Sequence, residues 1–375
     1  MKILYVMSIP WGWIKQRPHF IAEELSKHVK VDVYSKKSMN VSSNHLLTDK
    51  PSTSTNLTIN TYRIYPFYSF KLTRYLPLDW INRLLLRMQV KDIKGYDYIW
   101  ITSPRIYSLF SSLIDVNQKL IYDCMDDAAE FEHAVKDKWI KNYILNNEKR
   151  LLARANYVFA SADYLKNKIL ERSGLINKNV LVVNNAIQLP DARECEITDV
   201  EILKKLNLIK SISKPIIYVG TIAEWFDFKT VISVLENDSS LNLVLIGPNN
   251  VCIPQHKQIT YLGTIKREFI FSFFTYAYAL VMPFKVTELI KSVNPVKLYE
   301  YIYSGKPVIA SRYGETIKFS EFVFLYKDAD EFSNYLRNID PKYYNNDYKR
   351  KCIEFVSHNK WSDRCEVILS HIKGK

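Results

Sequence analysis

The sequence predicts an α/β protein built from two doubly wound domains, and three observations support this prediction. Short apolar runs typical of buried parallel strands alternate with segments of helix length from residue 2 onward. The alternation restarts after a polar, Pro-containing break at residues 188–199. The chain of 375 residues is also too long for one typical domain, because about 150 residues per domain is the usual expectation.

The first half of the chain opens with a strand–helix–strand unit. A strand at 2–8 leads through a loop to a helix at 18–28 that Pro18 begins. We expect residues 38–60, which are rich in Ser, Thr and Asn, to form a loop excursion. Strands are expected at 30–35, 96–103, 119–124, 157–161 and 180–185.

The second half repeats the alternation of strands and helices. One of its helices has well-marked limits, because Asn294 is a good N-cap, Pro295 suits the first helical position and Gly305 suits a left-handed residue after the last turn. A final helix at 359–372 can close either domain. Strands are expected at 214–221, 241–248, 259–264, 278–284, 307–311 and 322–326, and further helices near 227–236 and 266–276.

Composition narrows the class of protein. The net charge of +13 favours an anionic partner, namely nucleic acid, a membrane surface or a phosphorylated substrate, and the lack of a recognisable nucleic-acid-binding module argues against the first. No apolar run reaches the roughly 18 residues of a spanning helix, and Pro10 interrupts the N-terminus too early for a signal peptide, so we expect a cytoplasmic protein. Five scattered cysteines without a C-x-x-C pair predict neither a disulfide framework nor a zinc site.

Residues 62–94 have the composition of a segment that lies at a membrane surface. Aromatic and Leu residues there are interleaved with seven Arg and Lys residues, from Arg63 to Lys94. The alternative is a helix that packs on the core and has a basic outer face.

The helix that precedes the strand at 307–311 has an unusual polar face. Lys297, Glu300 and Tyr301 lie where a buried helix would carry apolar residues. A helix that runs directly into a buried parallel strand has its N-terminus, here Ser292 to Asn294, near the carboxyl ends of the strands, where such sheets bind ligands. Free backbone N–H groups there would suit a phosphate, although an ordinary amphipathic helix with solvated Lys and Glu explains the pattern as well.

Five segments taken together resemble the family 4 retaining glycosyltransferases of GT-B fold, in particular the branch of teichuronic acid and surface-polysaccharide biosynthesis. They are "WGWIKQRPHFIAEEL", "IYDCMDD", "IIYVGTIAEWFDF", "LVLIGP" and "NPVKLYEYIYSGKPVIAS". The resemblance covers nearly the whole chain except residues 38–95. It implies two Rossmann-like domains that face a central cleft: an acceptor-binding domain at 1–192, to which a terminal helix at about 358–375 returns, and a nucleotide-sugar-binding domain at 193–357.

The resemblance also implies a donor site around Glu300. This residue matches the second glutamate of the family's E-x7-E motif, whose carboxylate accepts hydrogen bonds from the donor ribose. Ser292 occupies the position of the first glutamate, and Glu288 lies four residues earlier. Further donor contacts are implied at Val293, Asn294, Pro295, Tyr301, Gly220, Thr221, Gly247 and Pro248.

The chain departs from the family where the donor diphosphate is usually bound. The family places an Arg and a Lys after the first strand of the second domain, but residues 220–227 contain neither. Lys297 is the first candidate to replace them, with Lys285 and Lys291 next, and solvated surface lysines are the alternative. Trp225 and Asp227 match a pattern of the branch and are candidates for contact with the sugar, the base or the acceptor.

In the first domain, the candidates lie after two strands. Gly12 permits close backbone approach to the sugar or leaving phosphate, and Trp11 and Trp13 offer apolar faces to a sugar or lipid. Arg17 and His19 are expected to point toward the same cleft, although a lone His is often structural.

Three acids, Asp123, Asp126 and Asp127, should lie at the carboxyl end of the strand at 119–124, without compensating bases. One of them can instead cap the next helix. We take Asp126, Asp127, His19 and Lys297 as the catalytic candidates.

The implied reaction moves a sugar from a nucleotide diphosphate to a hydroxyl of a glycan or polyprenyl-linked acceptor, with retention, without cofactor or metal, at the inner face of the cell membrane. A nicotinamide dehydrogenase is disfavoured because no G-x-G-x-x-G follows the first strand. An epimerase or phosphorylase on the same scaffold remains an alternative, as does a non-catalytic scaffold that binds glycan or membrane.

Overall fold

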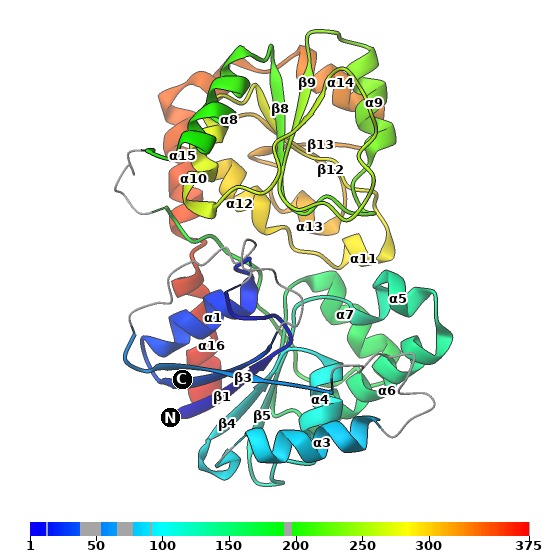
Figure 1. Ribbon diagram of the computed structural model, residues 1–375, viewed down its shortest axis with the longest axis vertical. Helices are drawn as coiled ribbons and strands as arrows, with labels where there is room; N and C mark the ends of the chain where they lie inside the picture. Colours follow the sequence, from blue (N-terminus) through cyan, green and yellow to red (C-terminus); the bar gives the residue numbers. More distant parts are fainter. Residues whose placement is uncertain (13, 38–53, 66–77, 91, 191–196, 375) are drawn as a thin grey trace. The chain divides into compact units, whose positions relative to one another are not determined.

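The computed structural model describes residues 1–12, 14–37, 54–65, 78–90, 92–190 and 197–374. These residues form two compact units (Figure 1). Unit 1 comprises Met1–Asn185 and Trp361–Lys375, and unit 2 comprises Ala186–Lys360.

Unit 1 contains a parallel sheet with the strand order β3-β2-β1-β4-β5-β6-β7. The strands are β1 (Lys2–Met7), β2 (Lys30–Lys36), β3 (Leu57–Tyr62), β4 (Tyr98–Ile101), β5 (Lys119–Cys124), β6 (Tyr157–Ala160) and β7 (Leu181–Val182). The central strands β1, β4 and β5 are almost entirely buried, which explains their continuous apolar runs.

Helices cover both faces of this sheet. Residues of α3, α4, α6 and α7 form one core with alternate side chains of the strands, and α1 packs beside α16. The helical segments are α1 (Arg17–Ser26), α3 (Leu78–Gln89), η2 (Ile93–Gly95), α4 (Pro104–Phe110), η3 (Ala128–Glu130), α5 (Glu132–Val135), α6 (Lys138–Arg154), α7 (Asp163–Ser173) and α16 (Trp361–Lys373).

Unit 2 contains a second parallel sheet, with the order β10-β9-β8-β11-β12-β13. Its strands are β8 (Pro215–Val219), β9 (Asn242–Ile246), β10 (Ile259–Tyr261), β11 (Ala279–Met282), β12 (Val308–Ser311) and β13 (Val323–Tyr326). The direction of winding reverses between β8 and β11, and open α/β sheets bind ligands beyond the carboxyl ends of their strands at such a point.

The helices of unit 2 also lie on both faces. Residues of α8, α10, α12 and α15 share one core, and those of α9 and α14 share the other. The helical segments are α8 (Val200–Ser211), α9 (Phe228–Glu236), α10 (Arg267–Phe274), α11 (Glu288–Lys291), α12 (Val296–Tyr303), α13 (Gly314–Ile317), α14 (Ala329–Arg337), η4 (Pro341–Tyr344) and α15 (Asn346–Ser357).

The predicted fold class of two doubly wound sheets is confirmed, and three details differ from expectation. Residues 57–62 form the strand β3 rather than a loop, while residues 38–53 lie outside the described part. The strand expected at 180–185 is only Leu181–Val182. The expected domain boundary after residue 192 falls in 191–196, also outside the described part, and the units divide after Asn185.

The helix expected at 294–304 starts later than predicted. Pro295 takes the N-cap position and Val296 is the first helical residue, so Asn294 is not the cap. The side chain of Asn294 instead donates a hydrogen bond from Nδ2 to the Glu315 carboxylate at 3.0 Å. Gly305 has φ of 67°, as the predicted left-handed residue after the last turn requires.

The terminal helix α16 is held to unit 1 by an aromatic contact. Trp361 is 2% exposed, and its ring stacks on that of Phe20 in α1 with centroids 5.0 Å apart. A helix from the end of the chain therefore completes the core of unit 1.

We expect Trp361→Ala to destabilise unit 1 by about 3–5 kcal/mol, because the substitution leaves a large cavity in the core. Hydrogen exchange should become faster in α1 and α16 and stay unchanged in the sheet of unit 2. Trp80→Ala is the control, since Trp80 is 64% exposed. Equal effects of both substitutions on unfolding would contradict this assignment.

Candidate functional site

The loops at the carboxyl ends of β8 and β9 are joined by backbone hydrogen bonds. Gly220 N donates to Ile246 O at 2.9 Å, and Ile222 N donates to Pro248 O at 2.8 Å. Gly247 has φ of 137°, and a Cβ atom there would collide with the carbonyl oxygen of Gly220. Only glycine at residue 247 allows the two loops to come this close. The backbone at the predicted donor residues Gly220, Thr221, Gly247 and Pro248 is therefore held in one arrangement.

The helix α12 is anchored to the same edge of the sheet by Tyr301. The buried Tyr301 hydroxyl accepts a hydrogen bond from Val219 N, at the end of β8, at 2.8 Å. Burial raises the pKa of this phenol well above its usual value. Tyr301 therefore stays neutral and serves as the anchor of α12, while its direct contact with a donor stays a prediction.

Glu300 is a buried carboxylate held between two cations. Its Oε1 pairs with Arg267 at the start of α10 at 2.7 Å, and its Oε2 pairs with Lys297 at 2.7 Å. Burial alone would raise the pKa of Glu300, but the two cations hold it below its usual value. The carboxylate is ionised and retains lone pairs that can accept hydrogen bonds from hydroxyl groups.

Sequence reasoning missed Arg267. It lies one residue inside the helix expected at 266–276, and a basic residue in the first turn of a helix is unfavourable for the helix dipole. This unfavourable position of Arg267 was the one sign in the sequence that its side chain pairs with a carboxylate elsewhere in the fold.

Two of the backbone N–H groups that were expected to be free before α12 are hydrogen-bonded within the chain. Residues Glu288–Lys291 form the short helix α11, and Ser292 N and Val293 N donate to Leu289 O and Ile290 O at 3.1 and 3.0 Å. Val293 N is therefore not free in this structure, and its contact with a phosphate stays a prediction. Ser292 is buried, and its hydroxyl donates to Glu288 O at 3.3 Å.

The three candidate lysines have different surroundings. Lys297 pairs with Glu300, and Lys291 pairs with Glu288 at 2.8 Å. Lys285 is exposed and forms no ion pair with a described residue. Asp227 caps α9, because its Oδ1 accepts from Thr230 N at 3.2 Å and its Oδ2 accepts from the Thr230 hydroxyl at 2.7 Å.

In unit 1, the loop after β1 is held by His19. Its Nδ1 accepts a hydrogen bond from Gln16 N at 3.2 Å, so its Nε2 carries the proton and lies 3.2 Å from the Pro10 carbonyl oxygen. The Trp11 ring lies 5.1 Å from the imidazole, and Gly12 has φ of 91°. Both ring nitrogens of His19 thus contact backbone and position the loop, while Trp13 lies outside the described residues.

Arg17, which was expected to point toward the cleft, is instead engaged by buried groups of unit 1. It is 4% exposed, and its guanidinium pairs with the fully buried Asp123 at 2.8 Å and donates to Val183 O at 2.7 Å. The pair joins the start of α1 to the end of β5 and has a structural role.

The expectation that the acids after β5 lack compensating bases is wrong for Asp123, which pairs with Arg17, and for Asp127. This buried carboxylate pairs with Arg172 at 2.6 Å and with Lys168 at 3.2 Å, and it accepts from Ala129 N at the start of η3. Arg172 also pairs with the buried Glu148 at 2.5 Å. Asp127 is thus a structural anchor in this arrangement, and a catalytic role for it stays a prediction.

Asp126 differs from its neighbours because it forms no side-chain hydrogen bond or ion pair with a described residue. It is partly exposed at the carboxyl end of β5. Burial, opposed by Arg17 and reinforced by Asp123 and Asp127, raises the pKa of Asp126 to about 6. A carboxyl group with such a pKa can exchange a proton near neutral pH.

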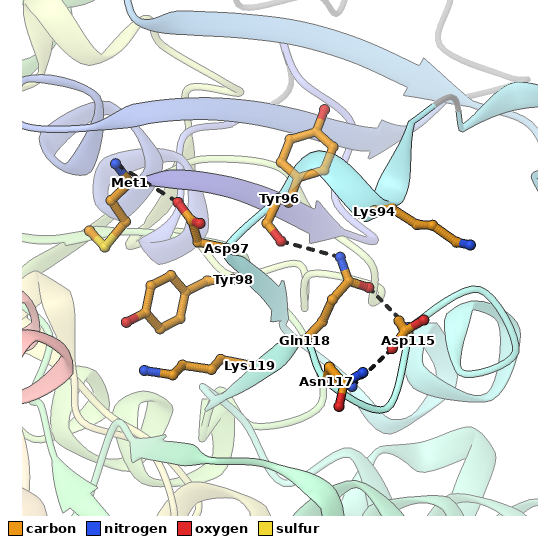
Figure 2. A pocket seen from close by; sticks show the side chains of 9 residues that line it. All are labelled: Met1, Lys94, Tyr96, Asp97, Tyr98, Asp115, Asn117, Gln118 and Lys119. Carbon is orange, nitrogen blue, oxygen red and sulfur yellow. Dashed lines mark hydrogen bonds and ion pairs between the residues drawn. The ribbon is translucent and has the colours of Figure 1, made fainter.

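A hollow of about 760 Å³ lies at the edge of the sheet of unit 1 where the strands begin (Figure 2). Residues at or just before the starts of β1, β4 and β5 line it. Several of their polar groups are hydrogen-bonded to one another, since Gln118 Nε2 donates to Tyr96 O and Asp115 N donates to Gln118 Oε1. This is the amino edge of the strands, so the hollow is a poor candidate for the active site.

Comparisons with known proteins support the fold assignment. No family model matches the chain. The chain is 23% identical over 245 residues to a protein of Bacillus subtilis (strain 168) named as a teichuronic acid biosynthesis glycosyltransferase, TuaH. The match covers 62% of this chain and 60% of the length of that relative.

Solved structures resemble the whole chain. The HepE protein of Anabaena, in complex with UDP and glucose, has a TM-score of 0.67 at 12% identity, with both chains fully covered. Sucrose-phosphate synthase from Thermosynechococcus elongatus has a TM-score of 0.70 at 16% identity, covering 100% of this chain and 98% of its own. A glycosyltransferase from Rickettsia africae has 0.65 at 13%, covering 100% and 98%. The chain has the GT-B fold.

We expect the free energy of unfolding of the wild type to fall as pH rises, and we expect Asp126→Asn to abolish the part of this fall that Asp126 causes. Because the pKa of Asp126 in the folded state, about 6, lies above its usual 3.8, ionisation between about pH 4 and pH 7 destabilises the fold. The full shift would correspond to about 3 kcal/mol, and partial solvation should reduce this to about 1–2 kcal/mol. Urea unfolding of both proteins at pH 4 and pH 7 measures the difference.

The exposed Asp330→Asn in α14 is the control for this experiment. A stability difference between wild type and Asp126→Asn that is constant with pH would contradict the raised pKa.

Proposed function

We propose that this protein is a family 4 glycosyltransferase that moves a sugar from a nucleotide diphosphate to an acceptor hydroxyl with retention. The observation that carries the proposal is the buried Glu300 carboxylate between Arg267 and Lys297, close to the carboxyl ends of β8 and β10. Its place in the GT-B fold and its match to the second E-x7-E glutamate support ribose binding. The names of the similar proteins, which include glycosyltransferases and a UDP complex, support the same reaction class.

The proposed chemistry depends on positioning and charge stabilisation. Glu300 binds the ribose hydroxyls, cations neutralise the departing diphosphate, and a leaving phosphate oxygen takes the proton of the acceptor hydroxyl. Asp126 is partly exposed and has no side-chain partner among the described residues, and we assign it to orienting the acceptor hydroxyl. No protein nucleophile is assigned.

We propose that transfer needs neither cofactor nor metal. Among the described residues, no group of three or more His, Cys, Asp and Glu side chains has an arrangement that suits a metal ion. Activity that survives excess chelator is the direct test.

We expect Glu300→Ala to weaken binding of the preferred nucleotide sugar by about 10- to 100-fold, because two hydrogen bonds to a charged acceptor are lost. Titration calorimetry with UDP-, GDP- and dTDP-sugars, without metal, measures the change. The exposed Glu354→Ala in α15 is the control for loss of one carboxylate.

Unchanged affinity in Glu300→Ala would remove the donor site from α12. Failure of every nucleotide sugar to bind the wild type would contradict the transferase and favour the non-catalytic scaffold.

We further propose that the acceptor is a lipid-linked glycan in surface-polysaccharide synthesis and that the protein works at the inner face of the membrane. No helix in the described ranges is long and apolar enough to cross a bilayer. The helix α3 instead supports surface contact, because Trp80, Leu84 and Met88 form an outward stripe with exposures of 64%, 48% and 65%. Arg87 lies exposed beside this stripe, while Leu78 and Leu86 pack inward.

We expect the triple variant Trp80→Ser, Leu84→Ser, Met88→Ser to lose at least about 10-fold in binding to phosphatidylglycerol-rich vesicles, because each residue forfeits burial of apolar area. The matched control is Val200→Ser, Leu203→Ser, Leu208→Ser on α8, whose side chains are also exposed. Cosedimentation measures both. Equal binding by both variants would refute contact through α3.

A further inference from the structure

A separate hollow in unit 2 lies beyond the carboxyl ends of β11, β12 and β13. Its volume is about 330 Å³. It also includes Asp227 and Thr230, which follow β8, so it lies at the β8–β11 reversal. Neither Glu300 nor Lys297 lines it. The lining residues are Asp227, Thr230, Phe284, Lys285, Val286, Ser311, Arg312, Tyr326 and Lys327.

Three cations from three different loops line this hollow without partners. Lys285, Arg312 and Lys327 are exposed, and none forms an ion pair with any described residue. Lys291, Lys297 and Lys318, by contrast, pair with carboxylates on their own helices or beside them. The cluster of Lys285, Arg312 and Lys327 therefore concentrates uncompensated positive charge in a concave site.

The backbone at each of the three cations is fixed. The buried Ser311 hydroxyl accepts from Phe284 N at 2.7 Å, and Lys285 N donates to Trp225 O at 2.8 Å. Arg312 N donates to Tyr326 O at 2.9 Å, which places Arg312 next to Lys327. The loops after β11, β12 and β13 are thus held together before any ligand binds, which lowers the entropy cost of binding.

We infer that this hollow binds the diphosphate group of a substrate. Three cations and the single carboxylate of Asp227 leave about two positive charges, which suits a diphosphate, and Arg and Lys are the side chains that bind phosphate oxygens. Asp227, the last residue of the stretch 220–227 in which both expected basic residues are missing, lines the same hollow as these three cations. Phe284 and Val286 give the hollow an apolar wall for the group attached to the diphosphate.

The variant Lys285→Gln, Arg312→Gln, Lys327→Gln tests this inference. Calorimetry with inorganic diphosphate should show binding by the wild type and a loss of about 100-fold or more in the variant, since several charge-assisted hydrogen bonds are removed. The matched control is Lys229→Gln, Arg337→Gln, Lys349→Gln, which removes the same charges from exposed positions outside the hollow. Equal weakening in both, or no binding by the wild type, would overturn the inference. The single variant Arg312→Gln, expected to lose about 10-fold, serves if the triple variant unfolds.

Two ligands identify the source of the diphosphate, and this identification rests on the proposed function. A loss confined to UDP assigns the cluster to the nucleotide donor, and a loss confined to farnesyl diphosphate assigns it to a lipid-linked acceptor. Glu300→Ala should retain full affinity for inorganic diphosphate. If no sugar is transferred but diphosphate binding still depends on the cluster, the proposed function fails while this inference stands.

Discussion

A carboxylate that is buried in a protein needs a cationic or hydrogen-bonding partner, and this requirement decides the role of many basic residues in both units. Arg17 is committed to Asp123, and Arg172 to Asp127. In unit 2, Arg267 is committed to Glu300. Basic residues near the strand ends therefore divide into those that neutralise protein carboxylates and those that have no carboxylate partner among the described residues.

The same requirement explains how the three acids after β5 differ. Asp123 and Asp127 are fully buried and paired, whereas Asp126 is partly exposed and unpaired among the described residues. Burial is the main cause of its raised pKa, and the negative charges of Asp123 and Asp127 add to it against the effect of Arg17. Asp123 and Asp127 are thus held by cations, whereas Asp126 can change its protonation state near neutral pH.

Much of the fold could be predicted because buried parallel strands have continuous apolar sequences, as β5 and β12 do. The strand β3 lies at the edge of its sheet, and its polar sequence LTINTY with partly exposed side chains hides it. The positions of Glu300 and Asp126 could also be predicted, since each follows from an element and a motif. Their partners could not, because Arg267 meets Glu300 only through tertiary packing.

The short helix α11 shows where local signals were overlooked. Thr287 accepts a hydrogen bond from Ile290 N and is followed by Glu288, which is the pattern of a helix start. Reading that pattern would have shown that Ser292 N and Val293 N already have partners. The cluster of Lys285, Arg312 and Lys327 was less accessible, although each residue lies shortly after a predicted strand.

A scaffold that only binds an anionic surface would need cations that face solvent, and it would not need Glu300. Burying a carboxylate with two cations costs free energy of desolvation that their attraction repays only in part, so such a cluster is weak evidence for stability alone. Glu300 is buried next to Tyr301, whose hydroxyl is hydrogen-bonded to Val219 N at the end of β8, the strand after which the ligand site of such a sheet is expected. The cost of this cluster is understandable if a bound substrate uses its remaining hydrogen-bonding capacity. The proposed donor-binding role of Glu300 would explain that cost more fully than a passive scaffold does.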